Sequence, residues 1–261
     1  MRRPQLVDAV TSVLLVSWLG AAAAESIGSL HCNDARGESV AVGRVVTIAG
    51  VVTAQFSTAK NARLFVQDGT GGVSAFGPPP ECVALGDSVR VTGEVASLGG
   101  QTQVTSGTRS PLRIEALGRG SRPVVALALA PTDVRGTRQP DGCEPNESRL
   151  VLVHDVLVRT AGGGVPAAGA RFTIDTDYRL AHAAADSASD WVPMRVWSTS
   201  PCDASRTLVG QPVPTTPVQV TGVVSQYSSR TPTQGGYLIL PRTRDDVQPG
   251  IGDWREPVLN R

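Results

Sequence analysis

Arginine and aromatic side chains gather in several extended segments of the sequence, and together they suit the binding of an unpaired nucleic-acid strand. Bases stack on flat aromatic faces, while arginine contacts the phosphates. In the segment Arg63–Gln67 such side chains occupy alternate positions, so they share one strand face, opposite Leu64 and Val66. The candidate ligand-binding residues are Arg63, Phe65, Gln67, Phe76, Arg171, Phe172, Arg195, Trp197, Tyr227, Arg230 and Tyr237.

Core packing is the alternative interpretation of the aromatic candidates. Only 4% of the residues are aromatic, so the hydrophobic cores must depend mainly on Val, Leu and Ala. In a small barrel, Phe65, Phe172 and Trp197 would then be filling side chains rather than ligand contacts. For Arg230 the alternative is a solvated side chain on the surface.

Catalytic patterns are weak in this sequence. It contains no G-x-S-x-G, H-E-x-x-H or P-loop motif. His154 stands beside Asp155, and His182, Asp186 and Asp190 are spaced to align on a helix, where they would imitate a metal site; a solvated acidic loop is the alternative. We expect no catalytic residues, no metal and no cofactor, and therefore a protein that is not an enzyme.

The charge balance excludes a strongly basic coat that would hold nucleic acid without specificity. The chain has 24 Lys and Arg against 23 Asp and Glu, a formal net charge of +1. Residues 1–24 hold two arginines and one aspartate, which leaves 22 basic and 22 acidic residues in the remainder. A local cluster of arginines is still compatible with this balance.

The first 24 residues have the pattern of an export signal. Arg2 and Arg3 precede an apolar run from Val10, which ends in Ala22, Ala23 and Ala24 as an A-x-A cleavage site. A membrane anchor is the alternative, but the apolar run is short for a bilayer span. We expect cleavage after Ala24, a periplasmic or extracellular protein, and no membrane contact once the signal is removed.

The rest of the sequence reads as two copies of an all-β unit, with no long amphipathic helix. β-branched runs and glycine turns punctuate both copies. In the first copy the expected strands lie at 42–52, 63–67, 73–76, 88–95 and 101–105. In the second copy they lie at 150–158, 171–175, 194–197, 218–224 and 235–240.

The four cysteines follow this repeat. Cys32 and Cys143 each precede the first strand of a unit, while Cys82 and Cys202 each follow the middle hairpin. Four cysteines allow three pairings. The repeat favours Cys32–Cys82 and Cys143–Cys202, one disulfide within each unit.

Residues Val46–Val104 carry the motifs VTIAGVV, ARLFVQDGTGGVSAF and LGDSVRVTGEV. They resemble the anticodon-binding type of OB-fold, in which Gly50 and Gly93 suit bends of the first and fourth strands. The end of the second unit, VTGVVSQYSSRTPTQGGYLILPRTRDDV, is similar to tandem OB modules of exported bacterial proteins, often found beside extracellular nucleases. The second unit departs from the pattern: Asp175–Tyr178 replaces the glycine turn, and an insertion follows at Leu180–Asp190.

The resemblance implies two tandem five-stranded OB-fold Greek-key barrels after a cleaved signal peptide. The expected parts are a signal peptide at 1–24, a first barrel at 32–118, a linker at 119–142, a second barrel at 143–248 and a tail at 249–261. OB barrels bind oligonucleotides or oligosaccharides across strands two and three. We expect binding of single-stranded nucleic acid; the alternatives are an oligosaccharide or protein partner, or an accessory subunit of an extracellular nuclease.

Overall fold

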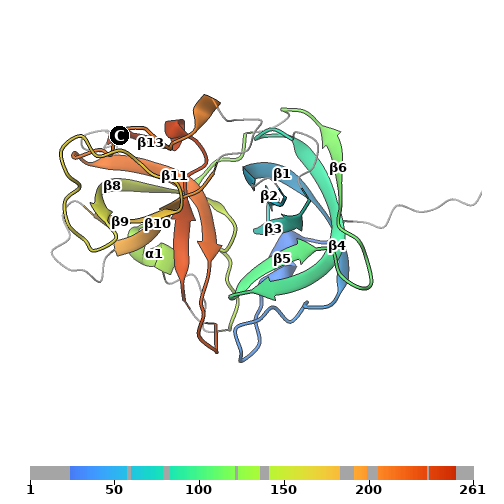
Figure 1. Cartoon of the computed structure of the whole chain (residues 1–261). Coiled ribbons are helices and arrows are strands. Elements are labelled where there is room, and N and C mark those ends of the chain that lie inside the picture. The colour runs from blue at the N-terminus through green and yellow to red at the C-terminus, as the bar shows by residue number, and fades with distance from the viewer. Residues whose placement is uncertain are drawn as a thin grey trace, which may run out of the picture.

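The computed structural model describes residues 24–57, 60–78, 83–120, 123–135, 141–182, 191–198, 205–233 and 235–250. These residues form two β-barrels that lie side by side, with strands as nearly all of the regular structure (Figure 1). Several predictions fall outside the described residues. They are the signal peptide up to residue 23, the metal-site alternative at Asp186 and Asp190, the cysteines Cys82 and Cys202, and the tail from residue 251.

The first barrel has the strand order of an OB-fold. Its strands are β1 (Val45–Ser57), β2 (Ala62–Gln67), β3 (Gly72–Gly77), β4 (Ser88–Leu98) and β5 (Gln101–Thr105). They are hydrogen-bonded in the order β1-β2-β3-β5-β4, and the pairing of β1 with β4 closes the barrel. β3 and β5 run parallel, and every other pair is antiparallel. A sixth strand, β6 (Arg113–Gly118), extends the sheet beyond β4.

The second barrel repeats this order. Its strands are β8 (Leu150–Thr160), β9 (Thr176–His182), β10 (Trp191–Val196), β11 (Val218–Gln226) and β12 (Tyr237–Leu240). β11 pairs with β8 to close the barrel, and β10 runs parallel to β12 as β3 does to β5. Two short strands, β7 (Leu127–Ala128) and β13 (Val247–Pro249), add to β8 and β11. The predicted all-β fold of two tandem OB barrels is confirmed.

Each barrel is closed at one end by a short helical turn that precedes its first strand. In the first barrel this is the 3-10 helix η1 (Ile27–Leu30), whose two terminal side chains are buried in the core. In the second barrel it is α1 (Pro131–Arg135), with Val134 buried in the core. A further 3-10 turn, η4 (Arg244–Asp246), leads into β13. None of the helices in the described ranges is long and apolar enough to span a bilayer.

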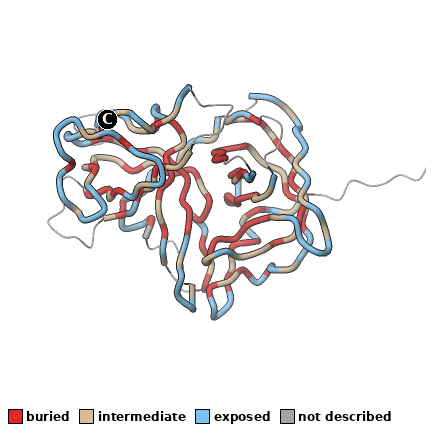
Figure 2. The backbone as a smooth tube through the Cα atoms, in the orientation of Figure 1, coloured by how far each residue is buried: buried red, intermediate tan, exposed pale blue. Residues whose placement is uncertain are grey.

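The two barrels are joined through an apolar cluster between their outer faces, which we call the interface cluster. A register shift between Val52 and Ala54 turns the end of β1 over, so that Ala54 and Phe56 point out of the first core. They meet Phe65 of β2 there. The second barrel supplies Leu150, Val223 and Leu240. Figure 2 shows that buried residues, in red, lie along the strands of both barrels.

The disulfide prediction is wrong. Cys32 is bonded to Cys143, with Cα atoms 3.9 Å apart and a sequence separation of 111. The two residues also form an antiparallel bridge, because the segments that lead into the two barrels lie against each other. Repeat logic assigned one bond to each barrel and did not anticipate this contact. The bond excludes both predicted pairs.

The second strand of the second barrel is also displaced from its predicted position. We expected it at 171–175, but β9 begins at Thr176. Arg171 forms only an isolated bridge to Pro212, and Asp175 adopts a left-handed conformation with φ of 54°. A residue in that conformation interrupts an extended strand. The predicted strands at 63–67 and 101–105 match β2 and β5 closely.

Candidate functional site

The outer face of β2 is the first candidate binding surface, and most of it is covered by the second barrel. Arg63, Phe65 and Gln67 share this face, as expected from their alternation with the buried Leu64 and Val66. Phe65 has no exposed surface, and Gln67 Oε1 accepts a hydrogen bond of 2.9 Å from the Leu150 N–H. Phe65 therefore has the packing role that was the alternative interpretation.

A buried amide on β5 fixes Arg63 at the edge of this covered surface. The Oε1 atom of Gln101 accepts hydrogen bonds from Arg63 Nη1 at 2.8 Å and from Ser225 Oγ at 2.9 Å. Its Nε2 atom donates to Ser148 Oγ at 3.2 Å. Since Ser148 and Ser225 belong to the second half of the chain, the position of Arg63 depends on the docking of the two barrels.

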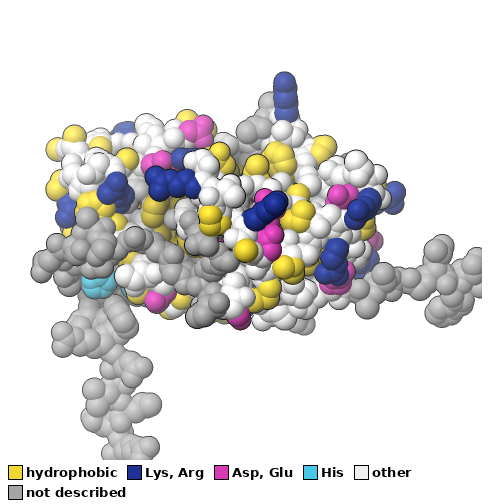
Figure 3. Space-filling view, turned by 90° about the horizontal axis from the view of Figure 1, so that it is seen from below, with side chains coloured by type: hydrophobic (Ala, Val, Ile, Leu, Met, Phe, Trp, Pro, Cys, Tyr) yellow, Lys and Arg dark blue, Asp and Glu magenta, His cyan; other side chains and the backbone are white. Residues whose placement is uncertain are grey.

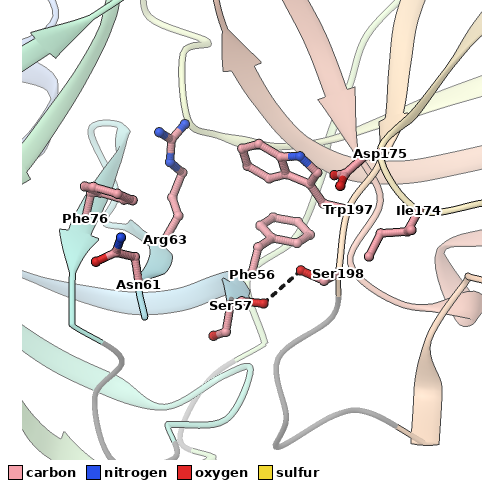
Figure 4. Close-up of a pocket in the computed structure, with 9 residues that line it drawn as sticks. All are labelled: Phe56, Ser57, Asn61, Arg63, Phe76, Ile174, Asp175, Trp197 and Ser198. Carbon is pink, nitrogen blue, oxygen red and sulfur yellow. Dashed lines mark hydrogen bonds between the residues drawn. The ribbon is translucent and has the colours of Figure 1, made fainter. Parts of the chain in front are cut away.

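A pocket opens beside Arg63 where the barrels meet, and we call it the junction pocket. It has a volume of about 520 Å³. Figure 4 shows its lining, which comes from both barrels: Phe56, Ser57, Asn61, Arg63, Phe76, Ile174, Asp175, Trp197 and Ser198. The two sides are linked by a hydrogen bond of 2.8 Å from Ser198 Oγ to the carbonyl of Ser57.

Aromatic rings surround the guanidinium of Arg63 in this pocket. Its central carbon lies 5.4 Å from the ring centre of Trp197 and 5.6 Å from that of Phe76. Phe56 meets Trp197 edge to face, with ring centres 5.7 Å apart. Burial lowers the pKa of Arg63, and the negative charge of Glu147 acts in the opposite direction. The pocket thus combines stacking surfaces with a desolvated cation.

A second group of candidates lies on the outer face of β9 and β10. Arg195 forms a bidentate ion pair with Asp177, with Nε–Oδ1 at 2.6 Å and Nη2–Oδ2 at 2.9 Å. The hydrogen bond to Asp177 raises the pKa of Arg195. Both residues line a shallow pocket of about 360 Å³ with Arg179 and Tyr227, whose side chain is 62% exposed. Arg179 also stacks on Trp191, with 4.8 Å from its guanidinium carbon to the ring centre.

Alternation along β10 makes these two pockets parts of one surface. Val192, Met194 and Val196 are buried in the core of the second barrel. The residues between them therefore point outward. Trp197 points the same way, because it follows the strand end two residues after Arg195. We call this surface, from Trp191 to the junction pocket, the β10 face.

The remaining predicted residues are not exposed on the β10 face: two are buried, and two are exposed elsewhere. Phe172 is 1% exposed and packs edge to face on Tyr178. Tyr237 is 3% exposed, and its hydroxyl donates to the buried carboxylate of Glu144. Arg171 is exposed and donates to the carbonyl of Gly210 at 2.6 Å. Arg230 is exposed in the segment between β11 and β12.

The sequence analysis missed Asn61, Asp175 and Arg179 as parts of this surface. Arg179 had a usable signal, because Asp177 and Arg179 alternate with the buried Tyr178 and Leu180 once the strand is placed correctly. Asn61 and Asp175 lie at strand ends and come together only through the docking of the barrels.

Figure 3 shows basic and acidic side chains interspersed over one face of the molecule, in agreement with the balanced charge.

Three solved structures resemble this chain over about a third of its length. No family model matches it, and neither does any curated protein. Solved structures match in part: a chain of a replication protein A heterotrimer bound to single-stranded DNA shares 23% identity, over 29% of this chain and 58% of that one, with a TM-score of 0.25.

Two tRNA synthetases give matches of similar extent. The asparaginyl-tRNA synthetase of Pyrococcus horikoshii has 23% identity over 30% of this chain and 21% of its own, with a TM-score of 0.25. A protein named as an aspartyl-tRNA synthetase of Leishmania major Friedlin has 15% identity over 32% and 19%, with a TM-score of 0.26. The present chain thus covers less than two thirds of each of these proteins. Its own strand order is that of two tandem OB barrels.

Proposed function

We propose that this protein is an exported, non-enzymatic binding protein that holds single-stranded nucleic acid along the β10 face. The observation that carries the proposal is a pair of arginine–tryptophan stacks, Arg179 on Trp191 and Arg63 on Trp197, at the two ends of that face. Guanidinium and indole planes both offer surfaces on which bases stack regardless of sequence.

The spacing of the two stacks fits several nucleotides. Trp191 and Trp197 are six residues apart, and a strand rises about 3.3 Å per residue, so the stacks are about 20 Å apart. OB barrels hold about 4 or more nucleotides of a single strand. The strand would run along β10 from the exposed ring of Tyr227 toward the junction pocket.

The charge distribution supports binding of moderate strength. Three arginines belong to the β10 face, Arg63, Arg179 and Arg195, and one of them is neutralised by Asp177. Each phosphate contact to a single strand contributes about −0.7 to the slope of log affinity against log salt. The two arginines that Asp177 does not neutralise would give a slope of about −1.4, far from that of a strongly basic protein.

Export is supported by the N-terminal pattern and by the Cys32–Cys143 bond. Disulfides form and persist mainly in oxidising compartments such as the periplasm and the cell exterior. The disulfide lies at the contact between the segments leading into the two barrels. The association with an extracellular nuclease depends on the sequence resemblance alone.

Titration with oligo-dT at low and high salt, followed by tryptophan fluorescence, tests the nucleic-acid proposal. We expect Arg179→Gln to weaken binding about ten-fold, because it removes a stacking plane and a charge. Arg90→Gln is the matched control, since Arg90 is a strand arginine paired with Glu115 on the first barrel. Absence of binding at low salt, or equal losses in both variants, would overturn the proposal.

An oligosaccharide is the second candidate ligand, and the Arg195–Asp177 pair is the observation that favours it. This ion pair makes the middle of the β10 face neutral while leaving polar groups beside exposed rings. Neutral sugars would bind there with little dependence on salt. A glycan screen that finds salt-independent binding, competing with no oligonucleotide, would select this candidate instead.

A further inference from the structure

We propose that the junction pocket selects a guanine base from the bound strand, through Asp175 on one side and Arg63 on the other. This inference rests on the proposed function, because the base arrives as part of a strand held on the β10 face. It adds a sequence preference at one position to a surface that otherwise binds by stacking.

The walls of the junction pocket suit a planar ring. Phe56 and Trp197 come from different barrels and meet edge to face, with Phe76 across the pocket beside Arg63 (Figure 4). Base–aromatic stacking is tolerant of sequence, so these walls alone would accept any base. A preference must come from the polar groups at the edges.

Two of those polar groups have opposite hydrogen-bonding character. The Asp175 carboxylate only accepts, and it takes part in no hydrogen bond found among the described residues. The Arg63 guanidinium only donates; one nitrogen is used by Gln101, and the buried Nε has no partner within the described structure. The pocket is therefore lined by a carboxylate that only accepts and by a guanidinium that only donates, beside the same aromatic rings.

Guanine is the base whose edges match this arrangement. It carries two adjacent acceptors, O6 and N7, which arginine contacts in the commonest specific protein–base interaction. It also carries two adjacent donors, N1–H and the N2 amino group, which a carboxylate can accept together. Adenine, cytosine and thymine each place an acceptor next to their donor on the pairing edge, so a carboxylate would face a lone pair.

The backbone holds Asp175 in place for this role. Its N–H donates to the Val196 carbonyl at 2.8 Å, which ties the turn before β9 to the end of β10. Its φ of 54° lies in the left-handed region, which aspartate and asparagine tolerate better than most residues. Asp175→Asn therefore preserves the fold while replacing one of the two acceptors by a donor.

The test compares oligo-dT with oligonucleotides that carry one dG, dA or dC at the centre, titrated into the whole protein under tryptophan fluorescence. We expect the dG oligonucleotide to bind about ten-fold tighter than the other three. In Asp175→Asn that advantage disappears: within this variant the dG oligonucleotide binds no tighter than the other three. Asp245→Asn is the matched control, because Asp245 is an exposed aspartate paired with Arg206; it keeps the preference.

The possible failures are distinguishable. If the wild-type protein binds all four oligonucleotides equally, the guanine inference is overturned and the proposed function stands. If a dG preference persists in Asp175→Asn, the assignment to Asp175 is overturned. If no oligonucleotide binds at low salt, both the inference and the proposed function fall.

Discussion

Replacing Glu144 by glutamine is expected to stabilise this protein, and to do so far more at alkaline than at acidic pH. Glu144 and Glu147 are both fully buried in the segment that joins the barrels. Tyr237 donates to Glu144 Oε1, and the Thr102 N–H donates to Glu147 Oε1 at 2.6 Å. The Oε2 atom of Glu144 lacks a hydrogen-bond partner in the described structure, and the Oε2 atom of Glu147 lies 3.6 Å from Nδ1 of His31.

The magnitude follows from the pKa of Glu144. Burial, and then the charge of Glu147, raise this pKa from 4.5 to about 7. One pKa unit corresponds to about 1.4 kcal/mol, so ionising Glu144 in the folded state costs about 3 kcal/mol. A raised pKa means that the folded state is most stable below about pH 4.5 and loses this stability as the pH rises through 7.

Among the other titratable groups around the carboxylates, His31 also makes the folded state less stable as the pH rises, whereas Arg63 keeps its charge. Burial works to lower the pKa of His31, but the hydrogen bond and charge of Glu147 outweigh it, and the pKa is raised. The contribution of protonated His31 to the free energy of unfolding is therefore also lost as the pH rises. Arg63, whose charge interacts with Glu147, stays protonated across this range. Tyr237 contributes its hydroxyl as a donor.

Glu144→Gln imitates the protonated acid, because its carbonyl accepts from Tyr237 and its amide donates toward Glu147. Denaturant unfolding should show a gain of about 3 kcal/mol at about pH 8 and less than about 1 kcal/mol at about pH 5. Glu115→Gln, at an exposed glutamate, is the control and should give no such difference. Equal gains at both pH values, or a loss at about pH 8, would refute the reasoning.

Two further predictions concern the contact between the barrels. Phe65→Ala should cost about 3–5 kcal/mol of unfolding free energy, because Phe65 has no exposed surface in the interface cluster; a loss below about 1 kcal/mol by denaturant unfolding would contradict this. Replacing Cys32 and Cys143 by serine should cost about 5 kcal/mol, since the bond closes a loop with a sequence separation of 111. Peptide mapping of the unreduced protein should recover these two cysteines in one species. Recovery of Cys32 with Cys82 would contradict the observed pairing.

The first barrel was predictable because its local patterns are complete. The Asp68–Gly72 turn and the alternation of β2 place the hairpin, and Asp68 Oδ1 accepts from the Thr70 and Gly71 N–H groups as such a turn requires. Gly50 marks a close approach, since a Cβ there would lie 2.6 Å from the Gln67 carbonyl oxygen. Sequence motifs of this kind act within a few residues, so they can be recognised without the tertiary structure.

The second barrel and the site were less predictable, because they depend on contacts distant in sequence. Without a glycine turn, nothing local separates the segment at 171–175 from β9, and the left-handed Asp175 decides the boundary. Residue type found Arg63, Phe76 and Trp197 as candidates. Their convergence in one pocket is a consequence of docking the barrels, as is the Cys32–Cys143 bond.

The coverage of Phe65 by the second barrel has a consequence for how this protein can be divided. In most tandem-module proteins each module can be excised, swapped or recombined, because its surface is finished on its own. Here, separating the two modules would expose an apolar surface on each half, with Phe56 and Phe65 on the first and Leu240 on the second. The two copies must therefore be retained together, in evolution as in protein engineering.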